Sequence, residues 1–369
     1  MTEQIVVAGG GYAGLAAAKL AARWTDAQVT LVNAHDKFVE RVRLHQLASG
    51  QELRDLPLSA LLDGTGVDLV VDRITGIDAG ERKIRTAGGR TLAYDRLIYA
   101  LGSRADMESV PGVAEHAYTV ASLDQARALR ARLADAQSVV VAGGGLTGIE
   151  AAAEIAESYP AVKVGLVTGG QLGAALSEPA RRYLRRTFAR LGVEIRDNVR
   201  IAEARADGLV LESGDHIAAD TVVWTAGFTV ADVAREAGFA VDENGRMLVD
   251  ETLRSVSHPE VSAIGDAAAM RMPTGQELRM ACATGLPSSQ IAVRAMAARL
   301  SGREPKPLRY RYLNQCISLG RRDGLVQFVH ADDSPRNTIL TGRLAARYKE
   351  LIVRSTVLFE RHPTLPASV

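Results

Sequence analysis

Cysteine is scarce in this chain of 369 residues, which contains only Cys282 and Cys316. The two lie far apart and outside any C-x-x-C spacing, so neither a disulfide framework nor a cysteine-rich zinc site is expected. Isolated cysteines usually behave as small buried apolar groups. We therefore predict a protein of a reducing compartment whose two thiols do not form a redox pair.

The chain also lacks a charge excess and long apolar runs. Lys and Arg number 44 against 43 Asp and Glu, so nothing favours nucleic acid as a partner. No stretch reaches the roughly 18 apolar residues of a membrane-spanning helix, and Met1–Gln4 has no basic region of a secretory signal. With 47% hydrophobic and 24% charged residues, we expect a cytoplasmic, soluble protein of two or three domains, without a metal site.

Glycine, in contrast, is patterned near the start of the chain. The apolar run Ile5–Ala8 predicts a buried strand, and Leu15–Ala22 has helix-forming composition. Between them, Gly9, Gly11 and Gly14 have the G-x-G-x-x-G spacing. Such glycines permit a tight turn, a close approach of pyrophosphate to the backbone, and close packing of helix on strand. The helix start adds free N–H groups and a positive dipole end for phosphates.

The same pattern recurs within Val139–Glu150, where Gly143, Gly145 and Gly148 stand in the same register. A single glycine-rich turn can be a tight connection without a ligand. Two copies, each between a predicted strand and a predicted helix, instead predict two dinucleotide-binding units.

Neither unit has the acid that usually binds ribose hydroxyls at the end of its second strand. The first such strand, Gln28–Val32, is followed by the neutral Asn33, with Asp36 as a second candidate. The second, Val162–Val167, is followed by Thr168-Gly169-Gly170. We therefore expect poor discrimination between NADH and NADPH. A nearby cluster of basic residues is expected to be a solvated helix face rather than a phosphate clamp: Arg181, Arg182, Arg185 and Arg186.

Two further strands are predicted to end in small residues. Tyr94–Ser103 and Thr221–Gly227 echo one another, each a strand that runs into an Ala-x-Gly or Ala-Gly turn. Val261–Ala269 then delivers Gly265 and Asp266 to the carboxyl end of a strand, where ligands bind in open α/β sheets. Asp266 is thus suited to a sugar or polyol hydroxyl, although a local Asx turn would also explain it.

From Pro305 the composition changes to a separate C-terminal unit. Strands are expected at 318–319 and 325–330, then a helix near 340–360. That helix has an apolar set that would pack on its own domain or contact a membrane surface: Leu344, Tyr348, Leu351, Ile352 and Phe359.

This order of parts resembles the flavoprotein reductases with two dinucleotide-binding domains, in particular the type II NADH dehydrogenases and the apoptosis-inducing-factor-like oxidoreductases. The resemblance implies an α/β fold with two Rossmann-like domains, for FAD and NAD(P)H, and a small C-terminal α+β unit. The FAD domain would comprise residues 1–107 and 228–303, the NAD(P)H domain 108–227, and the C-terminal unit 304–369.

The resemblance also implies site residues. Asn33 would bind the adenosine ribose, Asp266 the ribityl chain, and residues around Cys282–Leu286 would lie against the isoalloxazine. The implied FAD contacts are Gly9, Gly10, Gly11, Tyr12, Ala13, Gly14, Asn33, Lys37, Arg41, His45, Ile74 near the adenine, Ala100, Gly102 near the phosphates, Gly265, Asp266, Ala283 and Thr284. Those for NAD(P)H are Gly143, Gly145, Leu146, Thr147, Gly148, Glu150 near the nicotinamide, Thr168 and Gly227.

Two of these assignments have alternatives. Glu150 would also be explained as an acid in the first turn of a helix, where the dipole favours it. His45 would be structural, flavin-lining, or covalently linked to the flavin.

The function implied is an FAD-dependent oxidoreductase that passes a hydride from NAD(P)H to flavin and then electrons to a quinone or similar small acceptor. Action on a specialised metabolite and redox-dependent partner binding are the alternatives. A homodimer and a peripheral membrane contact are further expectations, although the chain lacks an obvious long C-terminal extension of the kind that anchors such enzymes.

Overall fold

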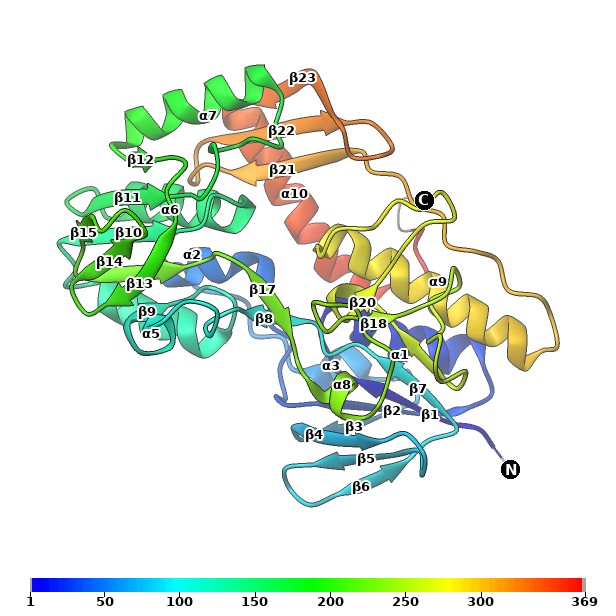
Figure 1. Ribbon diagram of the computed structural model, residues 1–369. Coiled ribbons are helices and arrows are strands. Elements are labelled where there is room, and N and C mark those ends of the chain that lie inside the picture. The colour runs from blue at the N-terminus through cyan, green and yellow to red at the C-terminus, as the bar shows by residue number, and fades with distance from the viewer. Residues whose placement is uncertain (1, 367–369) are drawn as a thin grey trace.

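The computed structural model describes residues 2–366 and is built around two parallel five-stranded sheets (Figure 1). The first sheet has the order β19-β7-β1-β2-β3. Its central strand β1 is buried from Ile5 to Ala8 because helices cover both faces, which explains the continuous apolar run. The bounds are β1 (Gln4–Ala8), β2 (Gln28–Asn33), β3 (Val67–Val71), β7 (Arg96–Tyr99) and β19 (Val261–Ala263).

The second sheet repeats this plan with the order β12-β11-β10-β16-β9. Its central strand β10 pairs in parallel with β11 and β16, as β1 pairs with β2 and β7. The bounds are β9 (Ala117–Tyr118), β10 (Ser138–Ala142), β11 (Lys163–Val167), β12 (Glu194–Arg196) and β16 (Thr221–Trp224). The predicted α/β fold with two Rossmann-like units is confirmed.

Helices flank both sheets. On the first, α1 (Tyr12–Trp24) packs along α9 (Cys282–Leu300), and α3 (Leu58–Leu62) lies near β3. On the second, α6 (Leu146–Ser158) follows the glycine-rich turn, with α5 (Leu123–Leu133) and α7 (Glu178–Leu191) beside it. The short helix α2 (Leu44–Ala48) comes from the first unit but packs against α5 and α6 of the second.

Each unit carries a small antiparallel insertion, between β3 and β7 in the first unit and between β12 and β16 in the second. These are β4 (Ile74–Asp78), β5 (Lys83–Thr86) and β6 (Thr91–Ala93) in the first, and β13 (Ile201–Arg205), β14 (Gly208–Leu211) and β15 (His216–Ala218) in the second. The chain crosses between the units through the paired strands β8 (Ser103–Ala105) and β17 (Phe228–Val230). Smaller elements are η1 (Arg41–Arg43), α4 (Val113–His116), α8 (Val233–Glu236), β18 (Met247–Leu248), η2 (Gly265–Ala267) and β20 (Ala268–Ala269).

The C-terminal unit is an antiparallel sheet of β21 (Asn314–Ser318), β22 (Gly324–Val329) and β23 (Pro335–Thr341), followed by α10 (Gly342–Arg361). The helix predicted near 340–360 is confirmed as α10, which begins at Gly342 because Leu340 still belongs to β23 and pairs with Val326. The strand predicted over Tyr94–Ser103 is interrupted: β7 ends at Tyr99, and Ser103 begins β8.

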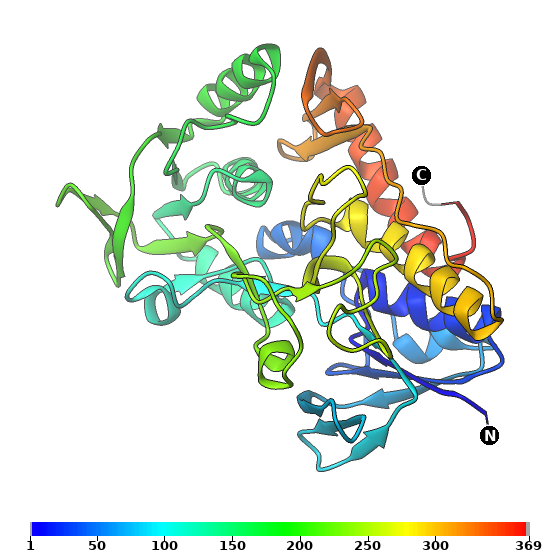
Figure 2. The same cartoon turned by 45° about the vertical axis from the view of Figure 1, so that its right-hand side comes forward.

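Helix α10 joins the C-terminal unit to the first dinucleotide-binding unit. Figures 1 and 2 show it running from the three-stranded sheet towards α1 and α9. At its far end, the ammonium of Lys19 on α1 donates to the carbonyl oxygens of Glu360 and Arg361 at 2.8 and 3.0 Å. These contacts satisfy C-terminal carbonyls of the helix and fix its position.

Within residues 2–366, no helix combines the length and the apolar composition that crossing a bilayer requires.

Candidate functional site

The two glycine-rich turns have nearly the same backbone. Gly9 has φ +103° and Gly143 has φ +118°, a region that other residues rarely adopt. A Cβ on Gly14 would lie 1.8 Å from the Gly9 carbonyl oxygen, and one on Gly148 would lie 1.9 Å from that of Gly143. Glycine is therefore required in both turns for the chain to close onto the following helix.

The middle glycine of each turn has a different explanation. Gly11 and Gly145 are the N-cap residues of α1 and α6, with φ −76° and −73°, which any residue can adopt. A Cβ on either would meet no protein atom within 4 Å. The protein itself therefore does not demand glycine there. The open space over each helix N-terminus fits a group that must approach the backbone closely, as a pyrophosphate does.

The residue at the end of the second strand of each unit lies against the glycine-rich turn: Asn33 ends β2, and Thr168 follows β11. Asn33 accepts a hydrogen bond from Gly10 N–H at 2.8 Å and donates one to the His35 carbonyl oxygen at 2.8 Å. Thr168 lies closer still to its turn: a Cβ on Gly144 would be 2.4 Å from the Thr168 hydroxyl oxygen, whereas a Cβ on Gly10 would be 3.0 Å from the Asn33 side chain. Asn33 thus fixes the first turn, a role that the sequence analysis did not assign.

Beyond the first turn, Asp266 gathers side chains at the carboxyl ends of β7 and β19. Ser103 donates to the Asp266 carboxylate at 2.7 Å, and Arg41 donates to the Ser103 carbonyl oxygen at 2.8 Å. The Arg41 guanidinium lies 3.8 Å from the same carboxylate. The predicted residues Arg41 and Asp266 are therefore brought together, with Ser103 as a residue that the sequence analysis missed.

Small residues bring α1 close to this cluster. Gly265 has φ +64°, and a Cβ there would lie 3.2 Å from that of Ala13. The Gly265 N–H donates to Ser288 of α9 at 3.1 Å, and Ser288 donates in turn to the Gly285 carbonyl oxygen at 2.6 Å. The α9 start is fixed by Thr284, whose hydroxyl donates to the carbonyl oxygens of Arg279 and Ala281.

Glu150 lies one turn inside α6, which begins at Leu146, so the interpretation as a first-turn acid was wrong. Its buried carboxylate accepts from the Lys349 ammonium at 3.0 Å and from Ser318 N–H at 2.9 Å. Burial alone would raise the pKa of Glu150, but Lys349 and His45 outweigh it and hold that pKa below its usual value. The same pairing raises the pKa of Lys349 against the opposing effect of burial. Both groups are therefore charged at neutral pH.

His45 is 5% exposed on α2 and faces this ion pair. Burial lowers the pKa of His45 to about 4, an effect that Lys349 adds to and Glu150 opposes, so the imidazole is neutral at pH 7. Its Nε2 atom is buried without a hydrogen-bond partner among residues 2–366. The structure places His45 beside the Glu150–Lys349 ion pair. None of the three interpretations of His45 included this neighbour.

One helical turn further along α6, Glu154 is fully buried and accepts a hydrogen bond from the Gln51 amide. Its other carboxylate oxygen has no partner in the part of the chain that the structure describes. Burial raises the pKa of Glu154 to about 7, with Arg321 opposing. Helix α6 thus presents two ionisable carboxylates in succession towards α2 and the C-terminal unit.

Both cysteines lie near Lys349. Its ammonium donates to the Cys316 carbonyl oxygen at 3.0 Å, and both thiols contribute to its raised pKa. Cys282 and Cys316 are free, but Cys282 is exposed and Cys316 half-buried, so the expectation of buried cysteines does not hold for Cys282. Desolvation by neighbouring groups raises the pKa of each thiol, Cys316 raises that of Cys282 further, and Lys349 opposes both shifts. Tertiary structure therefore brings Cys282 and Cys316 to the same ammonium although they lie far apart in the sequence.

The other predicted residues occupy varied positions. Lys37 pairs with Asp55 at 2.8 Å on the surface, and Ile74 begins β4 and packs on the first core. Ala100 touches the first turn, where a Cβ on Gly9 would lie 2.5 Å from its oxygen. The rest are the α1 residue Tyr12, the α6 residues Leu146 and Thr147, the α9 residue Ala283, and Gly102 and Gly227 with φ +68° and +95°.

The comparisons with known proteins agree with this architecture. The model of the pyridine nucleotide-disulphide oxidoreductase family matches residues 3–294. An NADH dehydrogenase-like protein of Mycobacterium tuberculosis is 33% identical over 314 residues, covering 78% of each chain. A type II NADH:quinone oxidoreductase of Staphylococcus haemolyticus is 25% identical over 95% of this chain and 94% of its own.

Among solved structures, the sulfide:quinone oxidoreductase of Aquifex aeolicus superposes with a TM-score of 0.82, at 19% identity, over 98% of this chain and 92% of its own. That likeness concerns the fold. The resemblance drawn from the motifs is confirmed by the family match, as are the expected cofactors, FAD and a nicotinamide coenzyme. The chain belongs to the pyridine nucleotide-disulphide oxidoreductase family and is an FAD- and nicotinamide-dependent oxidoreductase.

Proposed function

We propose that the chain is an NAD(P)H:quinone oxidoreductase that does not use its cysteines. The observation that carries this proposal is the buried Glu150–Lys349 pair, which lies between the helix of the second glycine-rich turn and the C-terminal unit. FAD, when bound, supplies the redox chemistry by taking up a hydride and releasing two electrons. The overall reaction converts NAD(P)H, a proton and a quinone into NAD(P)⁺ and a quinol.

The chain's own residues then have distinct tasks. The first turn, Asp266 and Arg41 would bind FAD, with Gly9, Gly11 and Gly14 against its pyrophosphate. The second turn, from Gly143 to Gly148, would bind the nicotinamide coenzyme.

Quinone reduction needs protons and stabilisation of negative charge on oxygen. A buried ammonium held charged by a carboxylate can provide the second, because few polar solvent molecules compete with it. Its raised pKa makes it a weak acid, so the protons would come from solvent. Lys349 would therefore donate a hydrogen bond to the acceptor oxygen, and Glu150 would keep it protonated. The free thiols have raised pKa values and are poor nucleophiles at neutral pH, which supports direct transfer rather than transfer through sulfur.

A membrane surface is a proposed second partner, since quinones partition into lipid. Leu344, Leu351 and Leu358 are 63%, 64% and 49% exposed and recur every seven residues along α10. The buried face of the helix is formed by other residues: Ala345, Val353 and Val357. Helix α10 thus has two apolar faces, one packed on the protein and one exposed, which could contact a membrane surface.

The decisive test is anaerobic reduction of the purified, yellow protein by NADH and by NADPH, followed by reoxidation with a panel of acceptors. A water-soluble quinone should restore the oxidised spectrum within seconds. With no acid after Val167, the two coenzymes should differ by less than about tenfold in kcat/KM, or ~1.4 kcal/mol. A colourless protein that takes up no FAD, or a reduced one that no quinone reoxidises, would overturn the proposal.

A further inference from the structure

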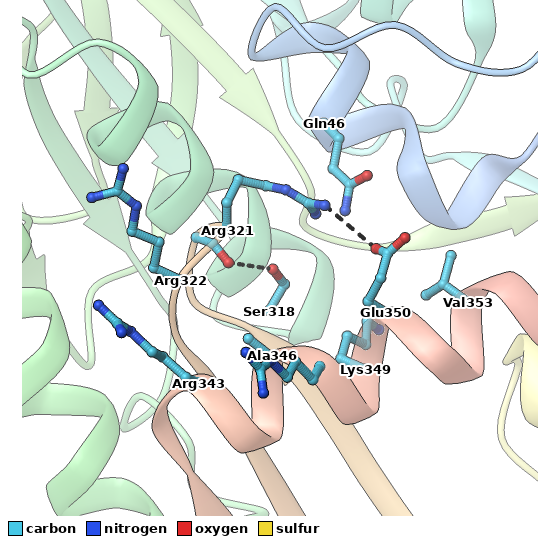
Figure 3. Close-up of a pocket in the computed structure, with 11 residues that line it drawn as sticks. Gln46, Ser318, Arg321, Arg322, Arg343, Ala346, Lys349, Glu350 and Val353 are labelled. Atoms are coloured by element: carbon cyan, nitrogen blue, oxygen red, sulfur yellow. Dashed lines mark hydrogen bonds and ion pairs between the residues drawn. The ribbon is translucent and has the colours of Figure 1, made fainter.

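A strongly basic pocket lies beside the Glu150–Lys349 ion pair, between α10, α2 and the turn that joins β21 to β22. Its volume is about 380 Å³, within the range of small-molecule sites. Five cationic side chains and a single carboxylate, Glu350, line it: Arg321, Arg322, Arg343, Arg347 and Lys349. Figure 3 shows Arg322 and Arg343 on one side and Gln46, Arg321 and Glu350 on the other.

The single carboxylate does not neutralise this pocket. Glu350 is already shared by Arg43, at 2.8 Å, Arg354, at 2.8 Å, and Arg321, at 3.4 Å. Lys349 is engaged by Glu150. Among residues 2–366, Arg322, Arg343 and Arg347 form no ion pair or side-chain hydrogen bond, and the one carboxylate that lines the pocket is shared by other arginines.

The local backbone adds to the positive potential. Helix α10 begins at Gly342 with Thr341 as N-cap, and no side chain caps it. Its first turn contains Arg343 and no acid, the reverse of the charge that a helix dipole favours. An anion in the pocket would relieve both the unpaired guanidinium groups and the uncapped N–H groups.

A nearly buried amide provides a fixed polar contact. Gln46 is 4% exposed, and its oxygen accepts from Arg43 at 3.0 Å. Its amide nitrogen makes no hydrogen bond within the described residues, and in Figure 3 the amide is directed towards the pocket. A donor of this kind, held by a neighbouring arginine, can orient a ligand oxygen.

We propose that this pocket binds a phosphate group, recognised by Arg322, Arg343 and Arg347 together with the Gln46 amide. The planar guanidinium fork matches phosphate oxygens in a bidentate manner, and three unpaired forks favour it over a monoanionic carboxylate. The phosphate belongs either to a soluble compound or to an anionic lipid headgroup, for which the Leu344–Leu351–Leu358 stripe borders the arginines. The inference does not depend on which acceptor the enzyme reduces.

The test compares two double variants that remove the same charge. Arg343→Gln/Arg347→Gln alters the pocket, whereas Arg303→Gln/Arg309→Gln alters two exposed residues of the segment between α9 and β21. The FAD-loaded protein is titrated calorimetrically with inorganic pyrophosphate in saturating NAD⁺, so that both glycine-rich turns are occupied. In parallel, it is sedimented with vesicles of phosphatidylcholine alone or with added phosphatidylglycerol.

Pyrophosphate binding that weakens at least tenfold in the pocket variant alone would identify a soluble phosphate ligand. A preference for phosphatidylglycerol vesicles that disappears in the pocket variant alone would identify a lipid headgroup. If neither probe distinguishes the pocket variant from its control, the proposal is wrong. Arg322→Gln, on a different element, provides a second disruption should the double variant lose FAD or its folded circular dichroism spectrum.

Discussion

The two dinucleotide-binding units share one backbone plan but differ in the helix that follows the glycine-rich turn. In the first unit α1 continues with Leu15, Ala16 and Ala17, all fully buried, and Ala16 packs against Leu286 of α9. In the second unit the position of Ala16 is taken by Glu150, followed one turn later by Glu154. The first helix is therefore adapted to close packing, and the second carries ionisable groups into the interior.

The same backbone plan therefore accommodates two different environments. A helix of small residues lets α9 approach and lets Gly265 and Asp266 come within reach of the first turn. A helix with buried carboxylates needs partners, which are His45 on α2, Gln51 just beyond α2, and Lys349 on α10. Both turns would bind a cofactor under the proposed function, but only the second helix offers buried carboxylates that can exchange protons.

The largest effect should come from filling the open space over one turn at a time. Gly11→Val and Gly145→Val each fit the protein, since no atom lies within 4 Å of the new Cβ and the backbone is extended. We expect Gly11→Val to weaken FAD binding about a thousandfold, or ~4 kcal/mol, by blocking the pyrophosphate. Gly145→Val should keep FAD and lose NAD(P)H affinity to a similar degree.

These two variants control each other. Released flavin is measured by fluorescence after gel filtration, and coenzyme affinity is measured from the rate of anaerobic flavin reduction. If Gly145→Val also loses FAD, or if Gly11→Val keeps it, the assignment of one cofactor to each turn fails.

The next effect concerns the ion pair that only the second unit has. Lys349→Met should slow reoxidation by a quinone about a hundredfold, or ~2.7 kcal/mol, because the acceptor oxygen loses the ammonium that stabilises its negative charge. Flavin reduction by NADH should change less than about threefold. The matched double variant Glu150→Gln/Lys349→Met should be more stable than Lys349→Met alone, since it leaves no unpaired buried carboxylate. Equal slowing of both half-reactions would contradict a role on the acceptor side.

A smaller effect should appear in the pH dependence of stability. The pKa of Glu154 is raised to about 7 in the folded protein, above its unfolded value, so the folded state binds the proton more tightly. Its contribution is fully present below the unfolded pKa and is lost as pH rises through about 7. Between pH 5.5 and 8 we expect a loss of about 2 kcal/mol that Glu154→Gln abolishes. Urea denaturation at both pH values measures it, and parallel curves for the two proteins would refute it.

The sequence predicted what depends on neighbouring residues. The two turns, Asn33 at the end of β2 and Asp266 after β19 all follow local patterns, and each lies where the pattern indicated. Ser103 could have been included, because it directly follows the glycine that ends the predicted strand. Lys349 could not, since its importance arises from contact with Glu150, on a helix distant in the sequence. The start of α10 was placed slightly too early because Ile339 and Leu340 continue its apolar composition into β23.

The smallest effect is expected where the sequence and the structure differ most, at the cysteines. Their separation in the sequence predicted that they act independently, yet both lie near Lys349, where sulfur chemistry would be conceivable. Their raised pKa values leave little thiolate at neutral pH, although an adjacent ammonium would favour one. We therefore expect Cys282→Ser/Cys316→Ser to retain NAD(P)H:quinone activity within about threefold, under ~0.7 kcal/mol in barrier. Steady-state assays with matched FAD content measure this, with each single variant as a control.

A loss of more than about a hundredfold, with FAD still bound, would mean that electrons leave through sulfur. The thiols of Cys282 on α9 and Cys316 on β21 would then carry electrons, a role separate from that of the ionisable carboxylates of α6.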